Sequence, residues 1–76
     1  ENPSDYQARF DLAVALGSSA ARRQEAVDQL IEIVRHDREW NEDGARKQLL
    51  QFFEAWGHKD PATAYGRRRL SAVLFR

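Results

Sequence analysis

Two helical segments joined by a link that carries a tryptophan constrain the fold of this chain most. The first segment ends near His36, and Trp40 follows in the link. Asn41 has the side chain of a helix N-cap, and Glu42 and Asp43 stand where the dipole of the next helix favours negative charge. That helix carries Ala45, Leu49, Leu50, Phe52, Phe53 and Trp56 and ends at Gly57. The order of helix, aromatic-bearing turn and helix predicts stacked helical hairpins.

A further helix precedes this pair. It opens at Asn2, with Pro3 in the first helical position, or at Ser4, which has capping-box spacing with Gln7. It stops near Gly17, because glycine commonly ends helices. Its apolar stripe consists of Tyr6, Phe10, Ala13, Val14 and Gly17, with Leu12 and Leu16 beside it. Spacings of three and four residues predict one buried side on this helix.

The helix before the tryptophan link is apolar on more than one side. It starts between Ser19 and Gln24 and runs to about His36. Its apolar residues are Ala26, Val27, Leu30, Ile31, Ile33 and Val34. Because this set is wider than the stripe of a surface helix, we expect packing on two sides.

A fourth helix starts at Asp60-Pro61, where an acidic N-cap precedes a proline in the first helical position, and it runs toward Arg76. The sequence contains no strand signal. Short links make consecutive helices antiparallel. The predicted fold is therefore all-α, with four helices arranged as two antiparallel hairpins.

Length and composition limit the functions open to the chain. Its 76 residues form a single small domain, and the absence of cysteine excludes disulfides and thiol nucleophiles. Twelve basic and twelve acidic residues give no net charge, so no overall field attracts nucleic acid or an anionic membrane. No apolar run is long enough to span a membrane. Because the chain contains no methionine and begins at Glu1, we interpret it as a piece of a longer protein.

Catalytic and metal-binding patterns are weak. His36 with Asp37, and His58 with Asp60, do not have a recognised metal-ligand spacing. The sequence contains no phosphate-binding glycine loop and no nucleophile motif. We therefore expect no enzymatic activity, no metal and no cofactor.

The basic run Arg67-Arg68-Arg69, with Arg76 beyond it, has two interpretations. Nucleic-acid binding would use such arginines for phosphate contacts. Consecutive helix residues do not share one face, however, and the total charge is neutral. A solvated surface or an acidic protein partner is the favoured interpretation.

The end of the last helix also has two interpretations. Leu70, Val73 and Leu74 suit packing on the preceding helix, whereas Phe75 cannot share their face. Leu74 and Phe75 could instead form an exposed apolar edge for a partner or for a second copy of the domain. The candidate protein-binding residues are Arg67, Arg68, Leu74 and Phe75.

Trp40 is interpreted as a structural side chain rather than a ligand-facing one. Just before the expected Asn41 cap, it can pack on Ala45 as a hydrophobic staple. The expected seam between the two hairpins consists of Trp40, Asn41 and Phe53.

The two hairpins match the period of tetratricopeptide repeats. In the first, the positions that fit the repeat are Asn2, Pro3, Phe10, Leu12, Ala13, Leu16, Glu25, Ala26, Leu30 and Ile33. The second departs further: Leu50 is the best match to the leading leucine, but Gln51 follows it where a small residue is usual.

At a finer level the chain resembles the C-terminal tetratricopeptide-like domain of bacterial thioredoxin-like co-chaperones, the chaperedoxin (YbbN-type) family. The most specific segments are the link from Asp37 to Asn41 and the closing run Arg67-Arg68-Arg69-Leu70-Ser71. The residues that carry the resemblance span almost the whole chain.

This resemblance implies a cytoplasmic protein with a thioredoxin fold upstream of this domain. It also implies binding of unfolded or oxidised client proteins and of the chaperonin. The neutral charge predicts that the chain binds neither nucleic acid nor a membrane. The alternative is a structural role, in which the domain dimerises or braces its neighbour. A nucleic-acid-binding helical domain that uses the arginines is the third and weakest hypothesis.

Overall fold

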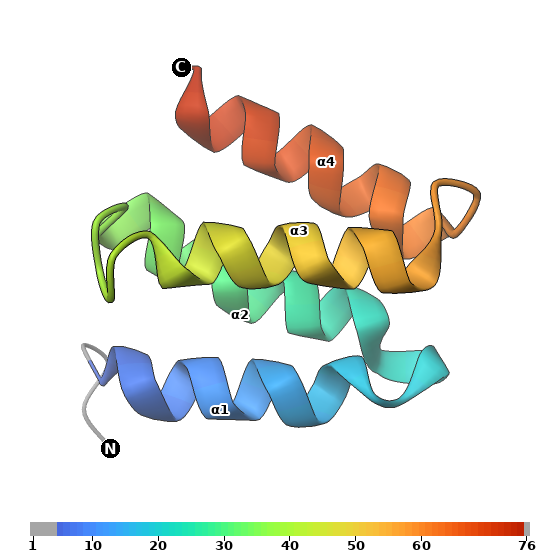
Figure 1. The fold of residues 1–76 in the computed structure, drawn as a ribbon, viewed down its shortest axis with the longest axis horizontal. Coiled ribbons are helices and arrows are strands. Elements are labelled where there is room, and N and C mark those ends of the chain that lie inside the picture. The colour runs from blue at the N-terminus through green and yellow to red at the C-terminus, as the bar shows by residue number, and fades with distance from the viewer. Residues whose placement is uncertain (1–4, 76) are drawn as a thin grey trace.

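The computed structural model describes residues 5–75 and contains four α-helices in that range. They are α1 (Tyr6–Gly17), α2 (Arg23–His36), α3 (Gly44–Trp56) and α4 (Pro61–Leu74), and a 3-10 turn, η1 (Ala20–Arg22), precedes α2. Consecutive helices run antiparallel, and residues 5–75 contain no strand (Figure 1). The all-α prediction of two hairpins is confirmed.

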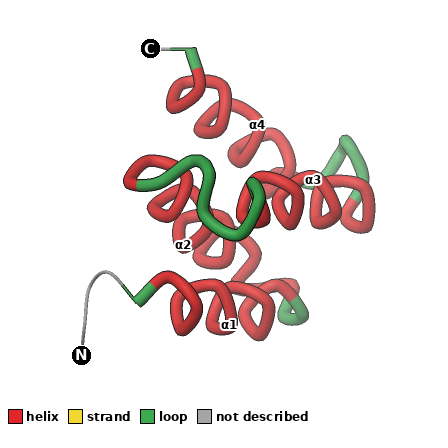
Figure 2. The backbone as a smooth tube through the Cα atoms, turned by 60° about the vertical axis from the view of Figure 1, so that its left-hand side comes forward, coloured by secondary structure: helices red, strands yellow, loops and turns green. Residues whose placement is uncertain are grey.

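Helix α2 lies behind the other three and contacts each of them (Figures 1 and 2). Its six predicted apolar residues are each no more than 1% exposed: Ala26, Val27, Leu30, Ile31, Ile33 and Val34. Burial of a Val, Leu or Ile side chain contributes about 1.5–3 kcal/mol, so α2 dominates the core. The expectation that this helix packs on more than one side is confirmed.

Two adjacent phenylalanines of α3 pack against glycines on different helices. A Cβ added at Gly17 of α1 would come within 3.0 Å of three ring atoms of Phe52. A Cβ added at Gly66 of α4 would lie 2.5 and 2.7 Å from ring atoms of Phe53. Each glycine therefore leaves the space that an aromatic ring of α3 occupies. Phe52 joins α3 to α1, and Phe53 joins it to α4.

Gly17 ends α1 as predicted, but for a different reason. The C-cap is Ser18, and Gly57 is the one glycine with a positive φ in the described residues. The lack of a side chain at Gly17 serves the close approach of Phe52. The predicted buried stripe of α1 is also partly wrong, because Val14 is 43% exposed.

The N-caps of α1 and α3 differ from the residues that the sequence predicted. Asn2 and Ser4 lie outside the described residues, and the cap of α1 is Asp5, whose carboxylate accepts the Ala8 N–H at 3.0 Å. Asp60 caps α4 as predicted, accepting the Ala62 N–H at 2.7 Å.

Asn41 is not the cap of α3, so that prediction was wrong. The N-cap is Asp43, which has a left-handed conformation and makes no side-chain capping hydrogen bond. Asn41, Glu42 and Asp43 all have positive φ values of 52°, 55° and 69° and precede the helix. The acidic residues therefore stand before the first turn of α3 rather than within it.

We call residues 37–43, between α2 and α3, the Trp40 link, and residues 57–60, between α3 and α4, the Gly57 link. They lie at opposite ends of the bundle (Figure 1). Within the described residues, no helix has the length and apolar character needed to cross a membrane.

Candidate functional site

The four candidate binding residues lie along two neighbouring stripes of α4, about 100° apart around its axis. Residues seven apart on an α-helix lie only about 20° apart around its axis. Arg67 and Leu74 are one such pair, and Arg68 and the C-cap residue Phe75 are another. Both arginines are exposed, and Phe75 is 82% exposed. Leu74 is half-buried and packs against the core, so it forms the inner edge of this surface.

Arg69 belongs to a different side of the same helix. Its guanidinium donates to the Tyr65 hydroxyl at 2.8 Å and lies 3.6 Å from the Asp28 carboxylate of α2. The Tyr65 hydroxyl in turn donates to Asp28 at 2.5 Å. This hydrogen bond to Asp28, with a smaller effect of burial, raises the pKa of Tyr65. The arginine run is thus divided, with two solvent-facing residues and one that joins α4 to α2.

A cleft of about 360 Å³ adjoins the arginines. Arg67 lines one wall of it from α4, and Leu50 of α3 is 44% exposed. Its lining residues are Leu50, Gln51, Phe53, Glu54 and Arg67. Sequence reasoning placed Leu50 in the repeat pattern and did not identify it as a surface residue. The α-helical spacing gives the signal, because Leu49 and Phe53 define the buried side and Leu50 lies off it.

Trp40 packs on α1, a partner that sequence reasoning missed. Its ring centroid lies 6.2 Å from that of Tyr6 and 5.6 Å from that of Phe10. Trp40 is half-buried and joins the Trp40 link to the first helix of the chain. The predicted staple partner was Ala45, which is buried in the same core cluster.

The other two seam candidates occupy different environments. Asn41 is exposed, and its side chain lies over Gly44, where an added Cβ would be 2.9 Å from its Nδ2. Phe53 is 3% exposed and packs against Gly66, between α3 and α4. The structure therefore does not bring Trp40, Asn41 and Phe53 together as one contact.

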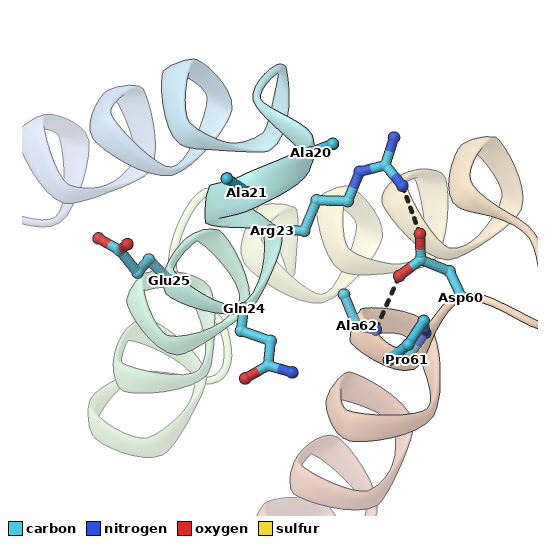
Figure 3. A pocket seen from close by; sticks show the side chains of 8 residues that line it. All are labelled: Ala20, Ala21, Arg23, Gln24, Glu25, Asp60, Pro61 and Ala62. Carbon is cyan, nitrogen blue, oxygen red and sulfur yellow. Dashed lines mark hydrogen bonds and ion pairs between the residues drawn. The ribbon is translucent and has the colours of Figure 1, made fainter.

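A second cleft, of about 420 Å³, lies between η1 and the start of α4 (Figure 3). Arg23 pairs there with Asp60, which also caps α4 (Figure 3). The Arg23 guanidinium lies 5.3 Å from the ring of Trp56, which stacks on Phe52 at 4.8 Å. The pairing of Arg23 with Asp60 and its stacking on Trp56 stabilise the fold, so these residues need no ligand to explain their positions. Sequence reasoning missed the Arg23 pair, because the partners are far apart in the chain.

The histidines do not form a metal site in the described part of the chain. His36 lies 3.1 Å from Glu32, one turn earlier on α2, and His58 is exposed. No group of three or more potential ligands among residues 5–75 could hold a metal ion. A hydrogen bond from Arg35, at 3.3 Å, lowers the pKa of Glu32, and His36 adds to the effect.

Comparison with known proteins supplies one match. Residues 1–75 match a family model described as Tetratricopeptide repeat, which covers all four helices. No curated protein and no solved structure shows a significant match to the chain.

Proposed function

Because the chain belongs to the tetratricopeptide repeat family, we propose that it is the non-catalytic protein-interaction domain of a thioredoxin-like co-chaperone. Domains of this family generally mediate protein–protein interaction and are typically non-catalytic. The proposed ligands are unfolded or oxidised client proteins and the chaperonin. A thioredoxin fold upstream and a cytoplasmic location are parts of the same proposal.

The observation that carries the proposal is the resemblance across both hairpins. Its two most specific segments are the Trp40 link and the closing run of α4, from Arg67 to Ser71. In the structure the first is anchored on α1 by Trp40, and the second presents Arg67 and Arg68 to solvent. One segment therefore supports the fold, whereas the other offers a surface to a partner.

Two measurements with the 76-residue chain test this function. Biolayer interferometry with purified bacterial chaperonin should give saturable binding. In a second assay, equimolar chain should reduce the light scattering of a chemically unfolded reporter enzyme as it is diluted from denaturant. An unrelated folded helical domain of similar size and net charge is the control in both assays. Absence of both effects would show that this is not a co-chaperone domain.

A structural role is the second candidate, because several large apolar side chains are exposed. They are Leu12, Val14, Leu50 and Phe75. Association with a second copy or with an adjoining domain would remove them from water. Sedimentation velocity decides between the two roles: a tight dimer that Phe75→Ser dissociates would favour the structural role, and a monomer would exclude self-association as the function.

A further inference from the structure

Arg67 and Arg68 are two adjacent, exposed arginines that form no hydrogen bond or ion pair with another side chain of residues 5–75. In a chain with equal numbers of acidic and basic residues, most arginines find one. Those that bond or pair with a side chain within residues 5–75 are Arg9, Arg22, Arg23, Arg35, Arg46 and Arg69. The described residues provide no such partner for Arg67, Arg68 or Arg38. Arg67 and Arg68 are adjacent and exposed, so their charge is available to another molecule.

Apolar surface lies on both sides of these two arginines. Phe75, 82% exposed, is seven residues beyond Arg68 and shares its side of α4. The cleft that Arg67 lines contains Leu50, which is 44% exposed. Glu54 also lines this cleft but forms no ion pair with Arg67. Positive charge between two exposed apolar groups is a pattern of protein-binding surfaces, where arginine and aromatic residues are enriched.

We infer that the outer side of α4, with Arg67, Arg68 and Phe75, binds an acidic peptide segment that also carries a large apolar side chain. This inference rests on the proposed interaction function and names the chemistry of its partner. Two adjacent carboxylates of the peptide pair with the arginines, and guanidinium geometry favours such pairing. The apolar side chain packs on Phe75.

The length of this surface sets the spacing in the peptide. From Arg67 to Phe75 the rise along the helix is about 12 Å. An extended chain covers that distance in about four residues. The best peptide therefore has its apolar residue about four positions from its acidic pair. A peptide whose apolar residue directly follows its acidic pair cannot contact the arginines and Phe75 at the same time.

An anionic membrane is the competing partner for arginine beside phenylalanine. Stable attachment to a membrane requires more than one strong signal, such as a lipid chain together with a polybasic patch. Two free arginines and one exposed aromatic ring supply less than that, and the chain has no net positive charge. A peptide ligand can instead pair with each arginine directly, so a peptide partner is favoured.

Fluorescence anisotropy with a synthetic, fluorescein-labelled peptide tests the inference. The probe contains two aspartates and a leucine about four residues away in a glycine–serine background. Arg67→Ala/Arg68→Ala should weaken binding by at least about tenfold, and Phe75→Ser should do the same. Higher salt should also weaken binding. Because all three side chains are exposed, the variants should retain the circular dichroism spectrum of the parent.

Matched variants elsewhere on the surface are the controls. Arg38→Ala removes an exposed arginine in the Trp40 link, and Leu12→Ala removes a side chain that is 48% exposed on α1. Both should bind the probe as the parent does. Control peptides carry asparagine for aspartate, serine for leucine, or the acidic pair next to the leucine, and each should bind more weakly.

Three results would overturn the inference. The first is no saturable binding of the probe. The second is equal binding by the parent, Arg67→Ala/Arg68→Ala and Phe75→Ser. The third is binding to phosphatidylserine vesicles that the peptide does not compete away. Loss of chaperonin and client binding with peptide binding intact would reject only the co-chaperone function. If chaperonin or client binding were unchanged by substitution of Arg67, Arg68 and Phe75, only the docking surface would be rejected.

Discussion

At one end of the bundle the link between α2 and α3 contains three non-glycine residues with positive φ. At the other end, the residue with positive φ in the link between α3 and α4 is Gly57. Left-handed conformations cost an L-residue roughly 1–2 kcal/mol each. The Trp40 link bears that cost and is anchored by aromatic contacts with α1. The Gly57 link avoids it and is anchored by polar contacts, the Arg23–Asp60 pair and the Asp60 cap.

The comparison shows that one link between helices can depend mainly on its local sequence and another mainly on tertiary contacts. In the Gly57 link the local sequence suits the observed backbone, because glycine, acidic cap and proline each fit their positions, and the Arg23–Asp60 pair adds a tertiary contact. In the Trp40 link the local sequence opposes the observed backbone, and a contact with residues 30 or more positions earlier in the chain must offset it. Mutations at the first end should therefore act through tertiary packing, and mutations at the second through backbone and capping effects.

The largest expected effect is that of Trp40→Ala. Loss of the contacts with Tyr6 and Phe10 should lower the free energy of unfolding by about 2–3 kcal/mol, somewhat less than for a fully buried tryptophan. Urea denaturation followed by circular dichroism measures this change. Trp56→Ala is the matched control. Its loss should be smaller, because it removes a stack with Phe52 on the same helix and a single cation–π contact with Arg23, rather than two aromatic contacts with another helix. A larger loss of stability in Trp56→Ala than in Trp40→Ala would contradict the comparison of the two links.

Gly57→Ala should have the next largest effect. Gly57 has φ 90° and ψ 155°, a region that is open essentially to glycine alone, so alanine should cost about 1–3 kcal/mol. No atom lies within 4 Å of an added Cβ, so the cost is that of the backbone and not of a clash. Chemical synthesis provides a control: D-alanine at this position suits positive φ and should retain stability. Equal losses with both alanines would contradict the backbone explanation.

Asp60→Ala should follow, with a loss of about 1–2 kcal/mol. It removes the cap on the Ala62 N–H and also leaves Arg23 without its carboxylate. Asp60→Asn is the control, because an asparagine side chain can still cap the helix but carries no charge. Its loss in thermal denaturation should be the smaller one. If the two variants were equally destabilised, the ion pair rather than the cap would be the main contribution at this end.

These differences also explain what could be foreseen from the sequence. The helices, the Asp60-Pro61 start and the burial of α2 follow from local patterns of periodicity and capping. The left-handed run before α3 does not, because Asn41 followed by acidic residues is typical of a helix start. The aromatic contacts of Trp40 with α1 help to stabilise the observed turn, and a local pattern contains no information about α1.

The candidate surface was foreseen in part for the same reason. The basic run identified Arg67 and Arg68 as candidates, and helical spacing with the chain end identified Leu74 and Phe75. Both arginines and Phe75 are exposed, whereas Leu74 is half-buried. The separation of Arg69 from its neighbours depends on Asp28 of α2. This detail requires the packing of helices that are distant in sequence.

Glu42→Gly should stabilise the protein by about 0.5–1 kcal/mol. Glu42 is exposed and has φ 55°, and glycine adopts this conformation without the steric cost, although it loses more chain entropy on folding. A rise in the melting temperature of roughly 2–8 °C would follow for a chain of this size. Glu39→Gly, also in the Trp40 link but without positive φ, should give no such gain. A loss of stability in Glu42→Gly would show that the left-handed run is not strained.

The smallest effect concerns pH and the last turns of α2, next to the Trp40 link. The hydrogen bond from Arg35 lowers the pKa of Glu32 in the folded state below its usual value of 4.5. A carboxyl group with a lowered pKa contributes stability above its unfolded-state pKa and loses it as the pH falls through the folded-state value. The parent should therefore exceed Glu32→Gln in stability near neutral pH, and this difference should shrink below about pH 4.

Urea titrations at several pH values measure this difference in stability, with Glu54→Gln near the opposite end of the bundle as the matched control. Because Glu32 is partly exposed, high salt should reduce the difference. A difference that stayed constant with pH would mean that the Arg35 contact does not favour the carboxylate.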